Sequence, residues 1–285
     1  MKTNEQIRKP RSHYLILSEL CYNKSCLADL TIILLLAFLI VGCMPCYYTP
    51  NVQNVPMFNA RNQANATVGY RFGLYSRGWD IQSAYSLTDH IGIMANYNHF
   101  GATYNESEDG WVAVEDGNFR GNLFEFGLGY YRPIPGDFIF EAYGGAGWGN
   151  ITNEFSDYLS HLESEVKYNR YFIQPAIGWR HSNINLAFST RFCAINYTHY
   201  TLQDPQNQYD MFELMGVDHN PCWMLEPAFT FRGGGKVVKF QTQIGLSFEL
   251  NNEEVNYDPF SFSFGVAFTI RGKTEKKEDQ SKTLP

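Results

Sequence analysis

The feature that most constrains the fold is a strict alternation of hydrophobic and polar residues near the end of the chain. From Phe260 to Ile270 every second residue is Phe, Val or Ile, and the residues between them are Ser, Gly, Ala and Thr. Side chains of a β-strand point alternately to its two faces, so this pattern predicts a strand with one bulky apolar face. Phe240 to Leu250 largely repeats it. Because the opposite face is small and polar, we interpret the bulky face as lipid-facing and the other as lumen-facing.

About ten segments of this kind occur along the chain, each near the 9–11 residues of a tilted membrane strand. They begin near Ala66, Trp79, Ile91, Asn122, Asp137, Tyr168, Asn183, Trp223, Lys236 and Phe260. The connections alternate between short (88–90, 133–136, 181–182, 233–235) and long (101–118, 151–167, 198–221, 251–259), with 75–78 as a brief exception. This alternation is typical of barrels with short periplasmic turns and long extracellular loops. We therefore predict an all-β fold, a single antiparallel up-and-down transmembrane β-barrel of about ten strands.

An apolar run precedes a cysteine near the start of the chain. Residues 30–41 are too short to span the ~30 Å hydrocarbon core comfortably, but they have the length of a signal-peptide core. The residues Ile40-Val41-Gly42-Cys43 that follow resemble a lipobox, which implies cleavage before Cys43 and its modification by fatty acyl chains such as palmitate. The alternative is a one-helix anchor with an ordinary Cys43.

Four segments follow from these patterns. We predict a cleaved lipoprotein signal peptide (1–42), a lipidated periplasmic tether (43–65), the barrel (66–271) and a disordered charged tail (272–285). The tether assignment depends on Pro50, Pro56 and several Asn without a sustained period. An even strand count then puts both mature termini in the periplasm.

The last strand carries a second resemblance. Ser263, Gly265, Phe268 and Ile270 resemble the final-strand signal read by the barrel-assembly machinery, although here the chain continues past it. Residues 66–271 as a whole are similar to small bacterial outer-membrane β-barrel families, which include adhesins, pores, lipid-modifying enzymes and proteases. The resemblance implies an outer-membrane location, with membrane lipids and the assembly and lipoprotein-processing machineries as partners. Fold alone does not fix the activity.

Charged residues are expected on the lumen face of several strands. The expected lumen charge network comprises Glu125, Glu141, Arg170, Arg191, Glu226 and Glu249. A barrel of about ten strands scarcely has room for more than its own side chains, so we interpret these groups as ion pairs that close the lumen. The alternative is an ion-selective channel, whose selectivity would change on neutralising Glu125 or Arg191.

No catalytic, metal or cofactor site is predicted. His99, His161, His199 and His219 fall in or beside the long loops, but no spacing pairs them with a carboxylate, and the G-x-S-x-G elbow of esterases is absent. A net charge of −7 argues against nucleic acid as a partner. Whether Cys193 and Cys222 form a disulfide stays open, since spacing does not fix geometry. Pro175 and Pro227 lie inside expected strands, where we predict bulges.

The sequence therefore predicts a lipid-anchored outer-membrane barrel with a structural or surface-interaction role and a lumen largely filled by side chains. A narrow pore or solute transporter is the first alternative, and a hydrolase at the outer rim is the second. A lipid-anchored soluble sandwich is a further alternative for the domain.

Overall fold

A computed structural model describes residues 46–104, 116–156, 161–203, 221–251 and 255–271. Its strands are β1 (Gln63–Gly73), β2 (Arg77–Ser86), β3 (Ile91–Tyr104), β4 (Asp116–Ile134), β5 (Phe138–Ser156), β6 (His161–Arg180), β7 (Ile184–Gln203), β8 (Cys222–Gly234), β9 (Val238–Leu246), β10 (Phe248–Glu249) and β11 (Phe260–Arg271). The described residues contain no helix with the length and hydrophobicity needed to cross a membrane.

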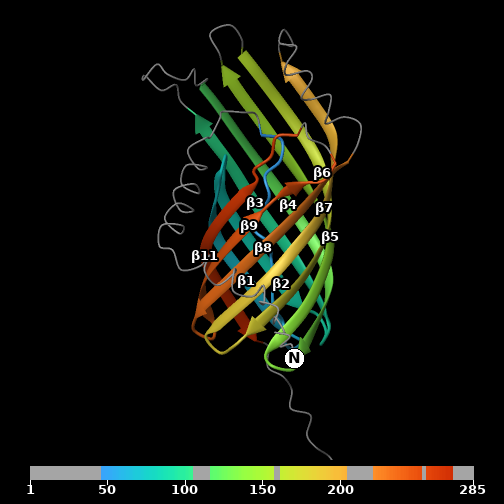
Figure 1. Cartoon of the computed structure of the whole chain (residues 1–285), viewed down its shortest axis with the longest axis vertical. Helices are drawn as coiled ribbons and strands as arrows, with labels where there is room; N and C mark the ends of the chain where they lie inside the picture. The colour runs from blue at the N-terminus through green and yellow to red at the C-terminus, as the bar shows by residue number, and fades with distance from the viewer. Residues whose placement is uncertain (1–45, 105–115, 157–160, 204–220, 252–254, 272–285) are drawn as a thin grey trace, which may run out of the picture. The chain divides into compact units, whose positions relative to one another are not determined.

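The strands form one closed antiparallel sheet. Each pairs with its sequence neighbour from β1 to β8, and the sheet closes because β1 pairs with β11 along its whole length. The segments β9 and β10 keep one register on β8, since Gly245 lies opposite Ala228 and Phe248 lies opposite Leu225. They are two parts of one strand interrupted at Ser247. The fold is thus a ten-stranded barrel, as predicted (Figure 1).

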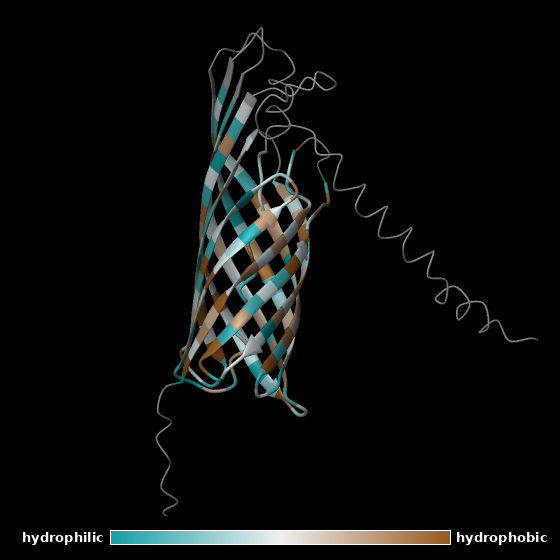
Figure 2. Cartoon of the chain, turned by 90° about the vertical axis from the view of Figure 1, so that its left-hand side faces the viewer, coloured by the Kyte–Doolittle hydropathy of each residue, from teal (hydrophilic) through white to brown (hydrophobic). Residues whose placement is uncertain are grey.

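The two faces of the wall differ as the alternation predicts. In β11 and β9 the bulky residues point outward, and Phe262, Phe264, Phe268 and Leu246 are 37–43% exposed. Their neighbours Ser263 and Gln243 are buried inside. Brown and teal residues alternate along the strands (Figure 2). A wall that exposes so many Phe, Ile, Leu and Val side chains has to face lipid, because water would not solvate such a surface favourably.

The interior departs from the expectation of small and polar side chains. Inward positions of β3 to β6 include Phe100, Phe119, Tyr168 and Phe172, all buried. They belong to one hydrophobic cluster with Tyr47 and other residues that precede the barrel. The regular pattern of the last two strands could not reveal this, because their own inward positions, such as Gln243 and Ser263, are small or polar.

The two ends of the barrel differ in their connections. At the short-turn end, β2–β3, β4–β5, β6–β7 and β8–β9 are joined by a few residues, and β1 starts and β11 ends there. At the long-loop end, β4 to β7 extend to 19–20 residues. At about 3.3 Å per residue such strands outreach a ~25 Å apolar belt. Parts of the predicted loops 101–118, 151–167 and 198–221 are therefore strand.

The predicted bulges at the two prolines are wrong. Pro227 lies opposite Thr190 in an unshifted register, and β6 and β7 keep one register on both sides of Pro175. A proline removes one ladder hydrogen bond but leaves the spacing of the strand unchanged. The register shift in this region lies between Lys167 and Tyr168 instead.

Residues 46–58, here called the plug, correct the tether prediction. Every residue of this segment is buried, with Tyr47, Val55 and Phe58 fully so. Cys46 lies beside Asn153, near the long-loop end of β5, and Asn59 contacts Gln63, at the short-turn end of β1. The chain therefore passes down the lumen before β1 begins (blue in Figure 1). The first described residue thus lies at the long-loop end, whereas the predicted tether would approach the barrel from the short-turn end.

Candidate functional site in the barrel lumen

The plug is an extended chain whose backbone is hydrogen-bonded by side chains of the wall. The N–H and C=O groups of the wall are already used in the strand ladders, so the plug cannot add as another strand. Asp80 accepts from the N–H of Val52 at 3.3 Å, and Gln82 donates to its C=O at 2.8 Å. Gln174 donates to the C=O of Asn54 at 2.7 Å. Buried backbone groups of the plug are thereby satisfied without a sheet partner.

One wall side chain binds both backbone groups of a plug residue. The amide oxygen of Gln243 accepts the N–H of Gln53 at 2.7 Å, and its Nε2 donates to the C=O of Gln53 at 2.9 Å. Thr230 Oγ1 accepts a further hydrogen bond from Nε2, at 2.7 Å, which orients the amide. The side chain of Gln53 donates to the backbone oxygen of Glu226 at 2.5 Å. These hydrogen bonds between Gln53 and Gln243, here called the clamp, fix the register of the plug against β8 and β9.

Charged groups gather around the middle of the plug. Arg170 pairs with Glu125, and Arg191 Nη1 lies 3.6 Å from Glu226 Oε2. Both arginines also donate to Asn51 Oδ1, at 2.6 and 2.5 Å. Asn51 Nδ2 in turn donates to Glu125 at 2.7 Å. The side chains of these four charged residues are at most 2% exposed, and two positive groups balance two negative ones.

Tyr48 links the two ion pairs on the side nearer the long loops. Its hydroxyl donates to Glu226 Oε1 at 2.5 Å and accepts from Arg170 Nη1 at 2.5 Å. Its ring packs edge-on against Tyr168, with centroids 6.2 Å apart. Because buried charges are costly unless paired and hydrogen-bonded, the plug completes the network rather than merely filling space.

The part of the plug nearest the long-loop end forms backbone hydrogen bonds with the segment before β11. Tyr47 donates its N–H to Asn256 O at 2.9 Å, and Asp258 donates its N–H to Tyr48 O at 3.1 Å. Tyr48 and Tyr257 form an isolated parallel bridge there. Asp258 is itself held by Arg71, at 3.5 Å, and by Ser76. This is the one backbone-paired stretch of the plug within the described residues.

The lower part of the plug is held at the short-turn end. Glu141 Oε2 accepts the N–H of Met57 at 2.9 Å, and Arg180 donates to its C=O at 2.6 Å. Asn65 donates to the C=O of Pro56 at 2.6 Å. A Cβ on Gly178 would lie 2.8 Å from Met57 Sδ, so this glycine makes room for the plug.

The predicted lumen residues divide into three groups. Glu125, Arg170, Arg191 and Glu226 form the central network. Glu141 binds the lower end of the plug instead. Glu249 lies in β10, where the thiol of Cys222 is 3.4 Å from its Oε1.

The other singled-out residues are placed as follows. In the final strand, Ser263 points inward while Phe268 and Ile270 face outward, and Gly265 lies against the backbone of Val68. Cys193 and Cys222 are buried and not bridged. His99 contacts the amide of Asn122 at 2.9 Å, rather than a carboxylate. Cys43 and His219 lie outside the described residues. Within them, no group of three His, Cys, Asp or Glu could hold a metal ion.

Sequence reasoning missed the plug residues Tyr48, Asn51, Gln53 and Asn54. A usable signal was present, because residues 46–58 contain no charged residue and include Tyr47, Tyr48 and Phe58. Segments that remain solvated are normally charged and poor in aromatic residues. Uncharged amide and hydroxyl groups suit a chain that must be buried among charges supplied by the wall.

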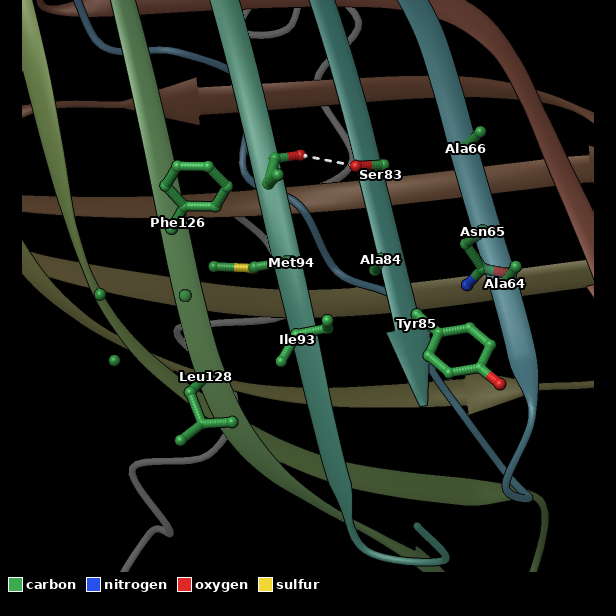
Figure 3. Close-up of a pocket in the computed structure, with 14 residues that line it drawn as sticks. Ala64, Asn65, Ala66, Ser83, Ala84, Tyr85, Ile93, Met94, Phe126 and Leu128 are labelled. Atoms are coloured by element: carbon green, nitrogen blue, oxygen red, sulfur yellow. Dashed lines mark hydrogen bonds between the residues drawn. The ribbon is translucent and has the colours of Figure 1, made fainter. Parts of the chain in front are cut away.

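The outer wall carries a shallow apolar groove of about 770 Å³ over β1 to β5. Figure 3 shows the small residues Ala66 on β1 and Ser83 on β2, with the larger Tyr85 below them and Phe126 across the groove on β4. Ser83 donates its hydroxyl to the backbone oxygen of Ala95 at 3.3 Å, so the groove presents little free polarity. It belongs to the lipid-facing surface.

A closed antiparallel sheet with an apolar outer belt and a plugged polar interior defines a transmembrane β-barrel protein. No family model and no curated protein matches the chain. Among solved structures it is similar to the attachment invasion locus protein Ail of Yersinia pestis, with 11% identity over 74% of this chain and 99% of that one and a TM-score of 0.36.

It is also similar to the translocator domain of the autotransporter NalP from Neisseria meningitidis, with 10% identity, 73% and 86% coverage and a TM-score of 0.43. The NanC porin matches with 11% identity, 72% and 98% coverage and a TM-score of 0.34. These are similarities of fold alone.

Proposed function

We propose that this chain is a lipid-anchored outer-membrane barrel whose lumen is closed by its own N-terminal segment, with a structural or surface-interaction role. The observation that carries the proposal is the plug, whose residues 46–58 are all buried. A solute pathway needs hydrated groups along the lumen. Here Arg170, Arg191, Glu125 and Glu226 are paired with each other and with plug residues.

The outer-membrane location is supported by the architecture. Barrels with an even strand number, short turns at one end and long loops at the other are typical of that membrane. The proposal places the long-loop end outside the cell, where the loops meet ligands, lipids or neighbouring proteins. The proposed partners during biogenesis are the barrel-assembly and lipoprotein-processing machineries, on the strength of the final strand and of Cys43.

Conductance in planar lipid bilayers tests the closed lumen. The full-length protein should insert without producing steady current steps. A variant lacking residues 46–58 serves as the matched control, because removing the plug leaves the wall charges without their partners and admits water. Steady conductance of the full-length protein would favour the alternative of a narrow pore or transporter.

A further inference from the structure

The plug has a direction. Its first described residue, Cys46, donates its N–H to Asn153, which lies three residues from the long-loop end of β5. Its last residues reach Asn59 and Gln63, at the short-turn end. The strand β1 then runs back up the wall from Gln63 to Gly73. The chain therefore descends through the lumen and ascends in the wall.

The space around the upper plug is occupied. Tyr47 and Tyr48 are fully buried, and the cluster around them includes Phe100, Phe119 and Tyr168. The segment before β11 covers them through Asn256 and Tyr257. The plug therefore enters the lumen at its long-loop mouth, beside Asn153.

We infer that this chain is threaded through its own barrel, so that Cys43 is delivered to the long-loop face. Consecutive Cα atoms are 3.8 Å apart, so Cys43 lies within about 11 Å of Cys46. The apolar belt of such barrels is ~25 Å tall, so an acyl group on Cys43 would enter the leaflet beside the long loops and not the opposite one. The inference rests on the proposed function for its assignment of that face to the cell exterior.

Epitope tags on intact cells test this topology. One tag is inserted between Met44 and Pro45, a second between Gly235 and Lys236 at the short-turn end, and a third after Asn251 at the long-loop end. We expect antibody to bind the first and third tags on intact cells, and the second only after the outer membrane is permeabilised. Heat-modifiable migration on gels verifies that each variant is folded.

A single cysteine substitution tests the same topology and perturbs the fold less than an inserted tag does. Pro45→Cys is made in a background with Cys46, Cys193 and Cys222 replaced by serine and is labelled with a membrane-impermeant maleimide. The same background without Pro45→Cys gives the level of nonspecific maleimide labelling. Val237→Cys, at the short-turn end, is the matched control. Labelling of Pro45→Cys on intact cells, at least tenfold above Val237→Cys, supports the inference.

The inference is overturned if the 44/45 tag and Pro45→Cys both require permeabilisation, as the short-turn controls do. If the two control tags exchange their behaviour, the assigned orientation fails, and the threading is supported only if the 44/45 tag still behaves like the long-loop tag. The closed lumen is tested separately by conductance, so a non-conducting barrel with a periplasmic residue 45 would refute the threading while leaving the closed lumen intact.

Discussion

Gln243 binds both backbone groups of Gln53, with its amide oxygen 2.7 Å from the N–H nitrogen and its amide nitrogen 2.9 Å from the carbonyl oxygen. A side-chain amide has one acceptor and one donor group, which is the complement of one peptide unit. In a closed sheet this is a simple way to bind an extended chain, because the wall has no free ladder positions. Gln82 and Gln174 each supply only the donor half of this arrangement, to the C=O of Val52 and of Asn54.

Gln243→Leu should destabilise the barrel by about 1–3 kcal/mol for each plug group left without a partner. Thr242→Val is the matched control, since Thr242 is adjacent on the outward face and its hydroxyl has no hydrogen-bond partner. Urea unfolding in lipid vesicles, followed by tryptophan fluorescence, measures both. Equal stabilities of the two variants would show that the clamp contributes nothing.

Arg170→Met should be more severe, because it leaves Glu125 buried without its cation. Breaking one partner of a buried pair typically costs about 3–5 kcal/mol. The additional substitution Glu125→Leu should recover part of this loss. Arg120→Met is the control, since Arg120 pairs with Glu154 at the surface, is 67% exposed and should lose less than about 1 kcal/mol. A small effect of Arg170→Met in the same unfolding assay would argue against the central network.

The lipid-facing belt predicts that the destabilisation caused by an outward-facing arginine depends on its depth in the membrane. Phe264→Arg lies near the middle of β11 and should cost about 2–4 kcal/mol, whereas Ile270→Arg lies near its short-turn end and should cost about 0–1 kcal/mol. Both side chains are exposed outward. Unfolding free energies in vesicles of one lipid composition provide the comparison. A reversed order would place the membrane elsewhere on the barrel.

The resemblance of residues 40–43 to a lipobox predicts a covalent modification of Cys43. Cells grown with an alkyne-bearing fatty acid should incorporate it into the wild-type chain, and Cys43→Ser should abolish the label. Cys46→Ser is the matched control and should keep it, because Cys46 is buried three residues further along. Label that survives Cys43→Ser would assign the acyl group to another residue.

The barrel could be predicted from sequence because lipid imposes a simple rule on every strand. Phe262, Phe264 and Phe268 had to point outward once their neighbours were small or polar, and the short and long connections then set the topology. The inward charges Arg170, Arg191, Glu125 and Glu226 followed from the same alternation. Their hydrogen bonds to the plug did not, because Arg170 and Arg191 both donate to Asn51, which lies far from them in the sequence.

The plug was not predictable by the same means. Residues 46–58 have no period, because an extended chain surrounded on all sides has no preferred face. The contacts of Tyr48 with Glu226 and of Asn51 with Arg170 depend on where the chain enters the lumen. Only the absence of charge and the presence of aromatic residues distinguished this segment from a solvated tether.

A disulfide between plug and wall tests the threaded lumen most directly. The amides of Asn54 and Asn96 are in contact inside the barrel at 2.8 Å. In the background with Cys46, Cys193 and Cys222 replaced by serine, Asn54→Cys with Asn96→Cys should crosslink on mild oxidation of the folded protein, and mass spectrometry should find the linked peptides. Asn54→Cys with Ala95→Cys, whose second position faces outward, should not crosslink. A folded barrel that fails to link residues 54 and 96, or links 54 to 95 equally well, would contradict the account.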